Sequence, residues 1–197
     1  AQQEKAKRIP AGLVHAVALA ESGRWLAQDK TTKPWPWTVT SGSDSFYLSS
    51  KEAAIAKVRE LQASGRTNID VGCMQINLHY HPNAFTSLEE AFDPDRNVAY
   101  GTKFLKDLRM KTRSWGKATA FYHSQDRVRG TAYRVKVYKL WRKLRGKPAP
   151  LATAGRAEQA PPGGLQKYFK NPVRRPLFSN RPSYLWKRDA IPVLRGG

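Results

Sequence analysis

An almost unbroken apolar segment near the N-terminus, IPAGLVHAVALAESG, constrains the fold more than any other part of the chain. Pro10 suits the first turn of a helix, and Gly23 suits the position at which a helix stops. Leu13 and Val17 lie four residues apart on the same face of that helix. A helix this apolar has to lie in the core of a folded domain. It places Glu21 at its C-terminal end, where the helix dipole disfavours a negative charge.

Glu21 is therefore a candidate for chemistry. A glutamate at the end of an apolar helix, facing a cleft, can stay protonated near neutral pH and serve as a general acid. The alternative is a solvated glutamate that ends a helix and does nothing else. The local sequence does not distinguish these two interpretations.

A second unusual stretch is TNIDVGCMQIN, residues 67–77. Gly72 permits a close approach of the backbone, and Gln75 and Asn77 supply amides that donate and accept hydrogen bonds. Such amides suit the N-acetyl and hydroxyl groups of an amino sugar. A polar loop beside a core strand is the alternative. Asp70 in the same stretch is a second candidate carboxylate.

The remaining patterns predict a mainly α-helical, α+β domain over residues 1–146. Residues 34–66 read as an insert made of a hairpin and a helix, with Ser49 and Glu52 as a capping box. We expect this insert to border the groove rather than belong to the core. The other expected elements are a short helix over 87–92, a helix over 93–111 that starts at Asp93-Pro94, and helices over 114–124 and 131–146.

The charge of the chain indicates an anionic partner. The 197 residues carry 35 Lys and Arg against 15 Asp and Glu, a net charge of +20. Nucleic acid, an acidic membrane face and a carboxylate-bearing cell-wall polymer are all compatible with this charge. Residues 147–197 are rich in proline and hold ten Lys and Arg against Glu158 and Asp189. We expect them to form a tail, extended or lying over the domain, that strengthens attachment to such a partner.

Other chemistries find less support. The single cysteine, Cys73, excludes an internal disulfide and a multi-cysteine zinc site, and it reads as a small buried hydrophobe rather than a nucleophile. His79 and His81 in HYHP are possible metal ligands, but no third ligand has a recognisable spacing. We therefore expect no metal and no cofactor. No apolar run approaches the length of a membrane span.

Four motifs, in order, carry a family resemblance: ESG, GCMQIN, NVAYGTKFL and AFYHS. They resemble the motifs of the SLT-type (family 1, goose-lysozyme-like) lytic transglycosylases over about residues 8–145. The resemblance implies a lysozyme-like helical fold over these residues, and a monomer. It also implies cleavage of the MurNAc–GlcNAc β-1,4 bond of peptidoglycan to give 1,6-anhydroMurNAc ends.

The same resemblance implies the site residues. Glu21 corresponds to the single acid and base, and Asn97 and Gly101 to structural helix positions. The residues that would line the groove are Ser22, Met74, Gln75, Asn77 and Tyr122.

Two departures from the family pattern stand out. The chain has Phe121-Tyr122-His123 where the family usually has Ala-Tyr-Asn. The insert of residues 34–66 is longer than the usual link, and it resembles an alphaproteobacterial subgroup tied to flagellar or secretion machinery. We therefore expect an exported, periplasmic protein, its leader removed, with components of such a machine as possible partners.

The role of Asp70 stays open at the sequence level. In c-type lysozymes a similar D-x-G-x-x-Q-I-N run carries a second carboxylate, which favours a muramidase using Glu21 and Asp70. A retaining pair needs carboxyl groups ~5–5.5 Å apart. Conjugation and type III secretion transglycosylases resemble this run and keep the aspartate, so Asp70 can instead hold the loop.

Two further functions remain as alternatives. A basic nucleic-acid-binding protein would account for the charge and for the segment YKLWRKLRG, but it leaves the four motifs unexplained. An inactive lysozyme-fold adaptor for a secretion apparatus is disfavoured by the intact Glu21.

Overall fold

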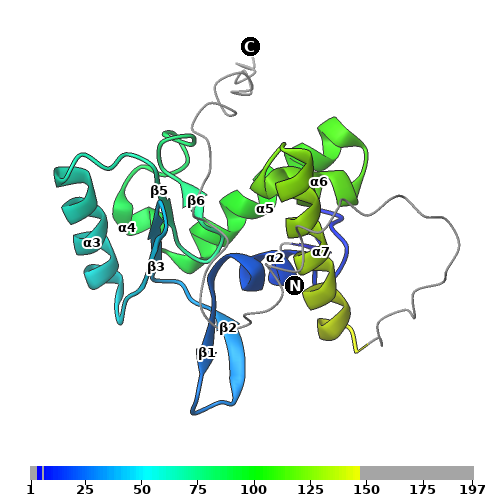
Figure 1. The fold of residues 1–197 in the computed structure, drawn as a ribbon, viewed down its shortest axis with the longest axis horizontal. Coiled ribbons are helices and arrows are strands. Elements are labelled where there is room, and N and C mark those ends of the chain that lie inside the picture. Colours follow the sequence, from blue (N-terminus) through cyan, green and yellow to red (C-terminus); the bar gives the residue numbers. More distant parts are fainter. Residues whose placement is uncertain (1–3, 6, 147–197) are drawn as a thin grey trace, which may run out of the picture.

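Two lobes joined by a long helix make up the described part of the computed structural model, residues 4–5 and 7–146 (Figure 1). One lobe is helical and the other carries a small sheet, so the expected mainly helical α+β class is confirmed. The expected tail, residues 147–197, lies outside the described residues. None of the helices within residues 4–5 and 7–146 is long and apolar enough to cross a membrane.

Helix α2 (Leu13–Ser22) forms the centre of the helical lobe, and Leu13 and Val17 are fully buried there. It begins three residues later than the Pro10 start expected from the sequence, because Gly12 adopts a left-handed conformation with φ 82°. The carboxylate of Glu4 then caps the helix. It accepts the N–H of Gly12 at 2.9 Å and the N–H of Val14 at 2.7 Å. These bonds satisfy two donors that a helix start leaves unpaired.

Helices α5, α6 and α7 complete this lobe. Helix α5 (Pro94–Thr112) begins after Asp93, as expected, and α6 spans Trp115–His123. Helix α7 (Arg127–Leu144) starts earlier than expected, because the Asp126 side chain accepts the N–H of Arg129 and caps it. In Figure 1, α5 runs from the sheet lobe to α6 and so connects the two cores.

A two-stranded hairpin that the sequence analysis missed follows α2. Strands β1 (Gly23–Leu26) and β2 (Thr31–Pro34) pair antiparallel. Neither strand is fully buried at any position, and their residues show no alternation of apolar and polar side chains. The period that identifies a strand is therefore absent from the sequence here.

The second lobe is built on a four-stranded antiparallel sheet with the order β4-β3-β5-β6. Its strands are β3 (Thr38–Ser41), β4 (Asp44–Tyr47), β5 (Ile69–Val71) and β6 (Ile76–Asn77). The hairpin expected within residues 34–66 is confirmed as β3 and β4. Because β3 also pairs with β5, the hairpin is part of the same sheet as the TNIDVGCMQIN stretch.

The insert of residues 34–66 does not merely border a groove, as the sequence analysis expected. Val39 on β3 and Ala54 and Val58 on α3 (Lys51–Ala63) are fully buried in the core of the sheet lobe. All four residues of β3 are buried, and the helical period of α3 places its buried side chains on one face of that helix. Helix α3 is capped by Ser50, which accepts the N–H of Ala53, and not by Ser49.

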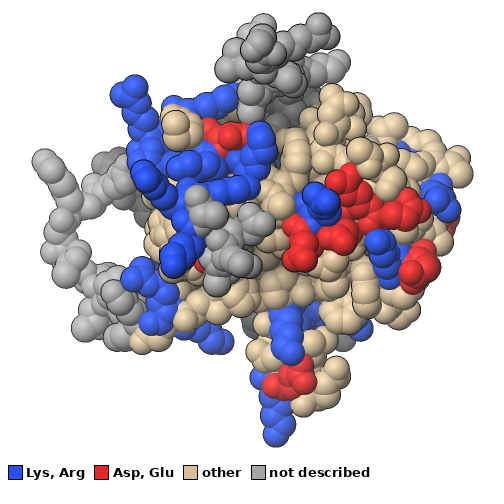
Figure 2. All heavy atoms as spheres, turned by 180° about the vertical axis from the view of Figure 1, so that it is seen from behind, with Lys and Arg blue, Asp and Glu red and all other residues tan. Residues whose placement is uncertain are grey.

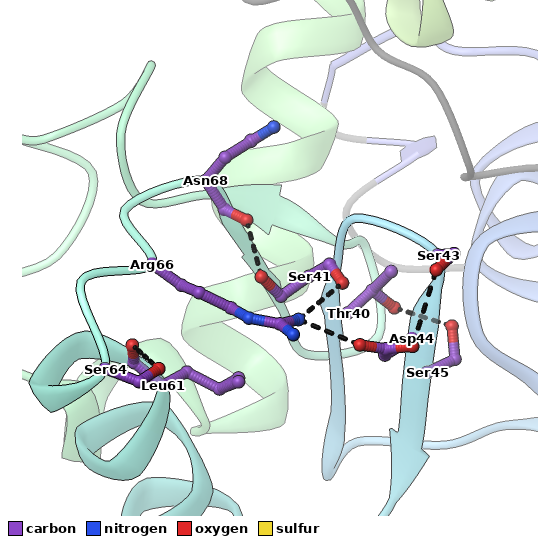
Figure 3. Close-up of polar contacts among 9 residues, drawn as sticks. All are labelled: Thr40, Ser41, Ser43, Asp44, Ser45, Leu61, Ser64, Arg66 and Asn68. Atoms are coloured by element: carbon purple, nitrogen blue, oxygen red, sulfur yellow. Dashed lines mark hydrogen bonds and ion pairs between the residues drawn. The ribbon is translucent and has the colours of Figure 1, made fainter.

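A charged contact fixes the edge of this lobe (Figure 3). Arg66, just after α3, donates to the carbonyl of Ser41 at 3.4 Å and to Asp44 Oδ2 at 2.8 Å. The hydrogen bond from Arg66 holds the pKa of the Asp44 carboxyl below its usual value. The pair is exposed, so we assign it a role in orienting the β3–β4 turn rather than in stability.

The side chain of Asn97 on α5 ties the two lobes together. Its Oδ1 accepts the N–H of Met74 at 2.9 Å, and its Nδ2 donates to the carbonyls of Val71 at 3.1 Å and Ala91 at 3.0 Å. Gly72 has φ +81°, and a Cβ there would clash with the Asn97 amide. The sequence interpretation of Gly72 as a point of close approach is confirmed.

Replacing Asn97 with alanine tests this connection. The substitution leaves one buried N–H and two buried carbonyls without a partner, so we expect it to lower the free energy of unfolding by about 2–4 kcal/mol. Thermal or denaturant unfolding measures the change. The exposed Asn83→Ala provides the control, with an expected change within about 0.5 kcal/mol. Equal effects of the two substitutions would contradict the assignment.

Candidate active site

Glu21 lies at the C-terminal end of α2 with 3% of its surface exposed. The hydroxyl of Tyr133 on α7 donates to Glu21 Oε1 at 2.7 Å, which joins two residues far apart in the sequence. A solvated glutamate, the alternative left open by the sequence, is excluded by this burial. The carboxyl group is held in one orientation by a neutral donor, as a group that exchanges a proton requires.

Tyr133 was not among the predicted site residues. It lies four residues before Val137 on the buried side of α7, so the sequence pattern marks it only as a core position. The ring of His123 on α6 stacks on the Tyr133 ring, with centroids 4.7 Å apart and planes at 10°. His123 is the residue that replaces the asparagine of the family pattern. It therefore packs behind the tyrosine that holds Glu21.

A lysine lies on the same side of α7. Lys136 Nζ donates to the carbonyl of Ala20 at 2.6 Å, and so places a cation at the negative end of α2. Burial lowers the pKa of Lys136 from its ordinary value, and the charge of Glu21 acts in the opposite direction. Glu21 and Lys136 thus influence each other electrostatically across the end of α2.

The turn after β5 is held against α2, α5 and α6. Ser22 Oγ donates to the carbonyl of Cys73 at 2.8 Å, and the hydroxyl of Tyr122 donates to the carbonyl of Met74 at 2.9 Å. The Met74 side chain packs on Gly101, where a Cβ would come within 2.7–2.8 Å of it. Ser22, Met74 and Tyr122, three of the predicted site residues, are therefore brought together next to the end of α2.

Gln75 occupies a left-handed conformation, with φ 49°, in this turn. Its Nε2 donates to the carbonyls of Gly72 at 3.1 Å and Thr38 at 3.2 Å. Its Oε1 is buried, and no group within residues 4–5 and 7–146 donates a hydrogen bond to it. A buried acceptor of this kind is matched to an N–H or O–H group of a ligand.

Asp70 and Asn77 face each other across β5 and β6, and 5% and 3% of their surfaces are exposed. Asn77 Nδ2 donates to Asp70 Oδ1 at 3.0 Å and also to Asn68 Oδ1, while Asn77 Oδ1 accepts the N–H groups of His79 and Tyr80. These bonds use the hydrogen-bonding capacity of the Asn77 amide. Asp70 thus holds the loop through Asn77, and the sugar-binding role of Asn77 stays a prediction.

The structure also shows the surroundings of His81 and Cys73, which the sequence raised as candidates for metal binding and nucleophilic chemistry. His81 forms a 3.0 Å hydrogen bond with the Tyr100 hydroxyl through Nδ1. Burial raises the pKa of the Cys73 thiol to about 11, so the thiol is neutral at physiological pH and is a poor nucleophile. Nowhere in the described chain do three or more His, Cys, Asp or Glu side chains come together as metal ligands.

One protein family matches most of this chain. The family described as "Transglycosylase SLT domain" matches residues 1–134. No curated protein and no solved structure matches the chain. The match covers more than half of the sequence and contains Glu21, Tyr122 and Tyr133. The chain therefore belongs to the SLT transglycosylase family, whose domain has a lysozyme-like fold and acts on peptidoglycan as a lytic transglycosylase, a lyase.

Proposed function

We propose that this protein cleaves the MurNAc–GlcNAc β-1,4 bond of peptidoglycan and leaves 1,6-anhydroMurNAc ends, with Glu21 as the single acid and base. In reaction terms it is a carbon–oxygen lyase acting on a polysaccharide. The observation that carries the proposal is the buried Glu21 at the end of α2, held by the Tyr133 hydroxyl at 2.7 Å. A buried carboxyl group with a fixed orientation suits proton donation.

The first step breaks the glycosidic bond. Glu21 gives its proton to the bridging oxygen as that oxygen leaves C1 of MurNAc with the bonding electron pair. The carbonyl oxygen of the N-acetyl group on the same sugar attacks C1 and forms a cyclic oxazolinium ion. This is the substrate-assisted route known for some glycosidases. Because Tyr133 fixes Oε1, we assign proton transfer to Oε2 of Glu21.

The second step closes the anhydro ring. The Glu21 carboxylate takes the proton of the C6 hydroxyl, and the C6 oxygen attacks C1 while the N-acetyl oxygen leaves. The carboxyl group regains its proton, and no water is consumed. Lys136, whose charge is coupled to that of Glu21, favours the carboxylate form required at this point.

Gln75, Ser22, Met74 and Tyr122 support the reaction in different ways. The buried Oε1 of Gln75 is the acceptor that we assign to an N–H or O–H group of the sugar. Ser22 and Tyr122 act through the backbone of residues 73 and 74, to which they donate hydrogen bonds. We assign them to positioning of the turn that carries Gln75.

Product analysis tests the proposed function. Purified sacculi are digested, and the glycan ends are separated and identified by mass. We expect 1,6-anhydroMurNAc ends, which are lighter by one water than reducing ends. Predominantly reducing MurNAc ends would instead indicate a muramidase that uses Glu21 and Asp70.

We further propose a periplasmic location and a role in opening the wall for a flagellum or secretion apparatus. The support for this setting is the insert of residues 34–66, which resembles that of proteins tied to such machines. Localisation of the tagged full-length protein, with and without a flagellar or secretion operon, tests it.

Glu21→Gln should keep the fold and remove activity. The amide preserves the shape of the side chain and can accept the Tyr133 hydrogen bond, but it cannot donate the proton. We expect kcat on sacculi to fall by about two to four orders of magnitude. The melting temperature and the exposed Glu60→Gln serve as controls. Near-wild-type turnover by Glu21→Gln would contradict the assignment of Glu21 as the acid and base.

Asp70→Asn separates the two mechanisms. Asn77 Nδ2 can still donate to the oxygen of the new amide, so the loop should keep its structure. If the N-acetyl group stabilises the cationic centre, activity should stay within about tenfold of wild type. A folded Asp70→Asn protein as inactive as Glu21→Gln would favour the two-carboxylate mechanism instead.

Lys136→Met should change the pH dependence. Removing the cation makes the carboxylate form of Glu21 less favourable, so ionisation needs a higher pH. We expect the basic limb of the pH–kcat profile, where Glu21 loses the proton that the first step needs, to move up by about one pH unit. Lys136→Arg keeps the charge and serves as the matched control. A lower melting temperature with an unchanged profile would show that Lys136 only packs.

A further inference from the structure

The net positive charge of residues 1–146 comes from one part of the chain. Residues 103–145, from the middle of α5 to the end of α7, contain 14 Lys and Arg against Asp107 and Asp126. Residues 1–102 contain equal numbers of basic and acidic residues, 11 of each. We call residues 103–145 the basic helices. Figure 2 shows Lys and Arg gathered over their side of the molecule, whereas Asp and Glu gather on the opposite side.

Aromatic rings fix several of these cations. Lys106 and Arg109 on α5 lie 6.0 Å and 5.7 Å from the centroid of the Trp115 ring on α6. On α7, Arg145 lies 5.3 Å from the Trp141 ring. Cations ordered on rings lose less conformational freedom when they bind an anion than cations on free side chains. The charge is therefore both concentrated and partly ordered.

One of the basic helices, α7, also contacts the end of α2 at which Glu21 lies. Tyr133 and Lys136 on α7 contact α2 at Glu21 and Ala20. On the same helix, Arg127 and Lys139 are exposed. Helix α7 thus contacts the end of α2 on its buried side and carries exposed cations on its outer side.

We infer that the basic helices dock the carboxylate groups of peptidoglycan stem peptides. This inference rests on the proposed function. It assigns a binding surface to the stem peptides, which take no part in the chemistry at Glu21. Each stem peptide carries carboxylates at a distance from the glycan bond, and the polymer repeats them along every strand. A cross-linked wall therefore offers many anions to a cationic face that lies beside the site of cleavage.

Charge complementarity favours this partner because single exposed pairs are weak and screened, whereas repeated pairs add through multivalency. The anion must also be one that Glu21 can reach, since α7 serves both sites. Phosphates of a lipid surface or of nucleic acid share the charge but have no link to the glycan bond. They are outcomes that the experiment separates.

The test uses the full-length chain with Glu21→Gln, so that bound sacculi are not cut. The first variant adds Lys117→Glu, Arg127→Glu and Lys139→Glu, which are exposed positions of the basic helices. A matched control adds the same charge change elsewhere: Lys30→Glu, Lys51→Glu and Arg96→Glu. Each set places two glutamates in the first turn of a helix, where a carboxylate is compatible with the fold.

Binding to purified sacculi is measured by co-sedimentation over a range of salt concentrations. We expect the first variant to bind at least about tenfold more weakly at low ionic strength, with a shallower salt dependence. The control should change by less than about twofold. Sacculi whose carboxylates have been converted to amides should bind the first variant and the control variant equally. Melting temperatures of both variants establish that they are folded.

Several outcomes would overturn the inference. An equal loss in both variants would assign binding to net charge alone, and an unchanged first variant would remove the basic helices from binding. Tighter binding to phosphatidylglycerol vesicles or duplex DNA than to sacculi, lost in the first variant, would identify a different partner. Cleavage of peptide-free glycan by the triple variant with Glu21 intact is the separate readout of the proposed function, and it should equal that of wild type.

Discussion

The side-chain amide of Asn97 is the contact on which the arrangement of both lobes depends. It bonds the turn after β5, the end of α4 (Leu88–Ala91) and, through its own backbone, α5. Together with the hydrogen bonds from Ser22 and Tyr122, it fixes the backbone of residues 71–74 relative to the helical lobe. Gln75, which we assign to substrate binding, directly follows that stretch of backbone. Gly72 and Gly101 lack side chains because the amide and Met74 occupy the space.

The carboxyl group of Glu21, the proposed acid, is positioned by contacts in the helical lobe. Helix α2 is buried, so its last residues cannot relax toward solvent, and its dipole, Lys136 and Tyr133 all act on the same end. The dipole favours the neutral carboxyl and Lys136 favours the carboxylate. A reaction in which one residue first gives and then takes a proton needs both forms to be accessible. Opposing influences of this kind are better suited to it than a strong preference for either form.

Sequence patterns predicted the elements that local chemistry determines. The start of α5 follows from Asp93-Pro94, and the β3–β4 hairpin follows from a Ser/Gly/Asp turn between two short strands. Contacts between distant residues left no such signal. Tyr133 reads as a core residue because its apolar ring obeys the helical period, whereas its hydroxyl reaches a residue 112 positions away. Glu4 caps α2 from outside the helix, and β1 and β2 pair without an alternating pattern. Motif order singled out Glu21 and Ser22 as candidates, but it did not show that Asn77 uses its amide in internal hydrogen bonds.

His123, which departs from the family pattern, lies directly behind the tyrosine that holds Glu21. An asparagine at that position and a histidine share little chemistry, yet both are planar groups at the end of α6. The histidine ring lies parallel to the Tyr133 ring and covers it. Since Tyr133 needs a fixed ring plane to hold Glu21 Oε1, a flat group behind it meets the requirement whatever hydrogen bonds that group makes. The constraint is thus on shape at residue 123 and on hydrogen bonding at residue 133.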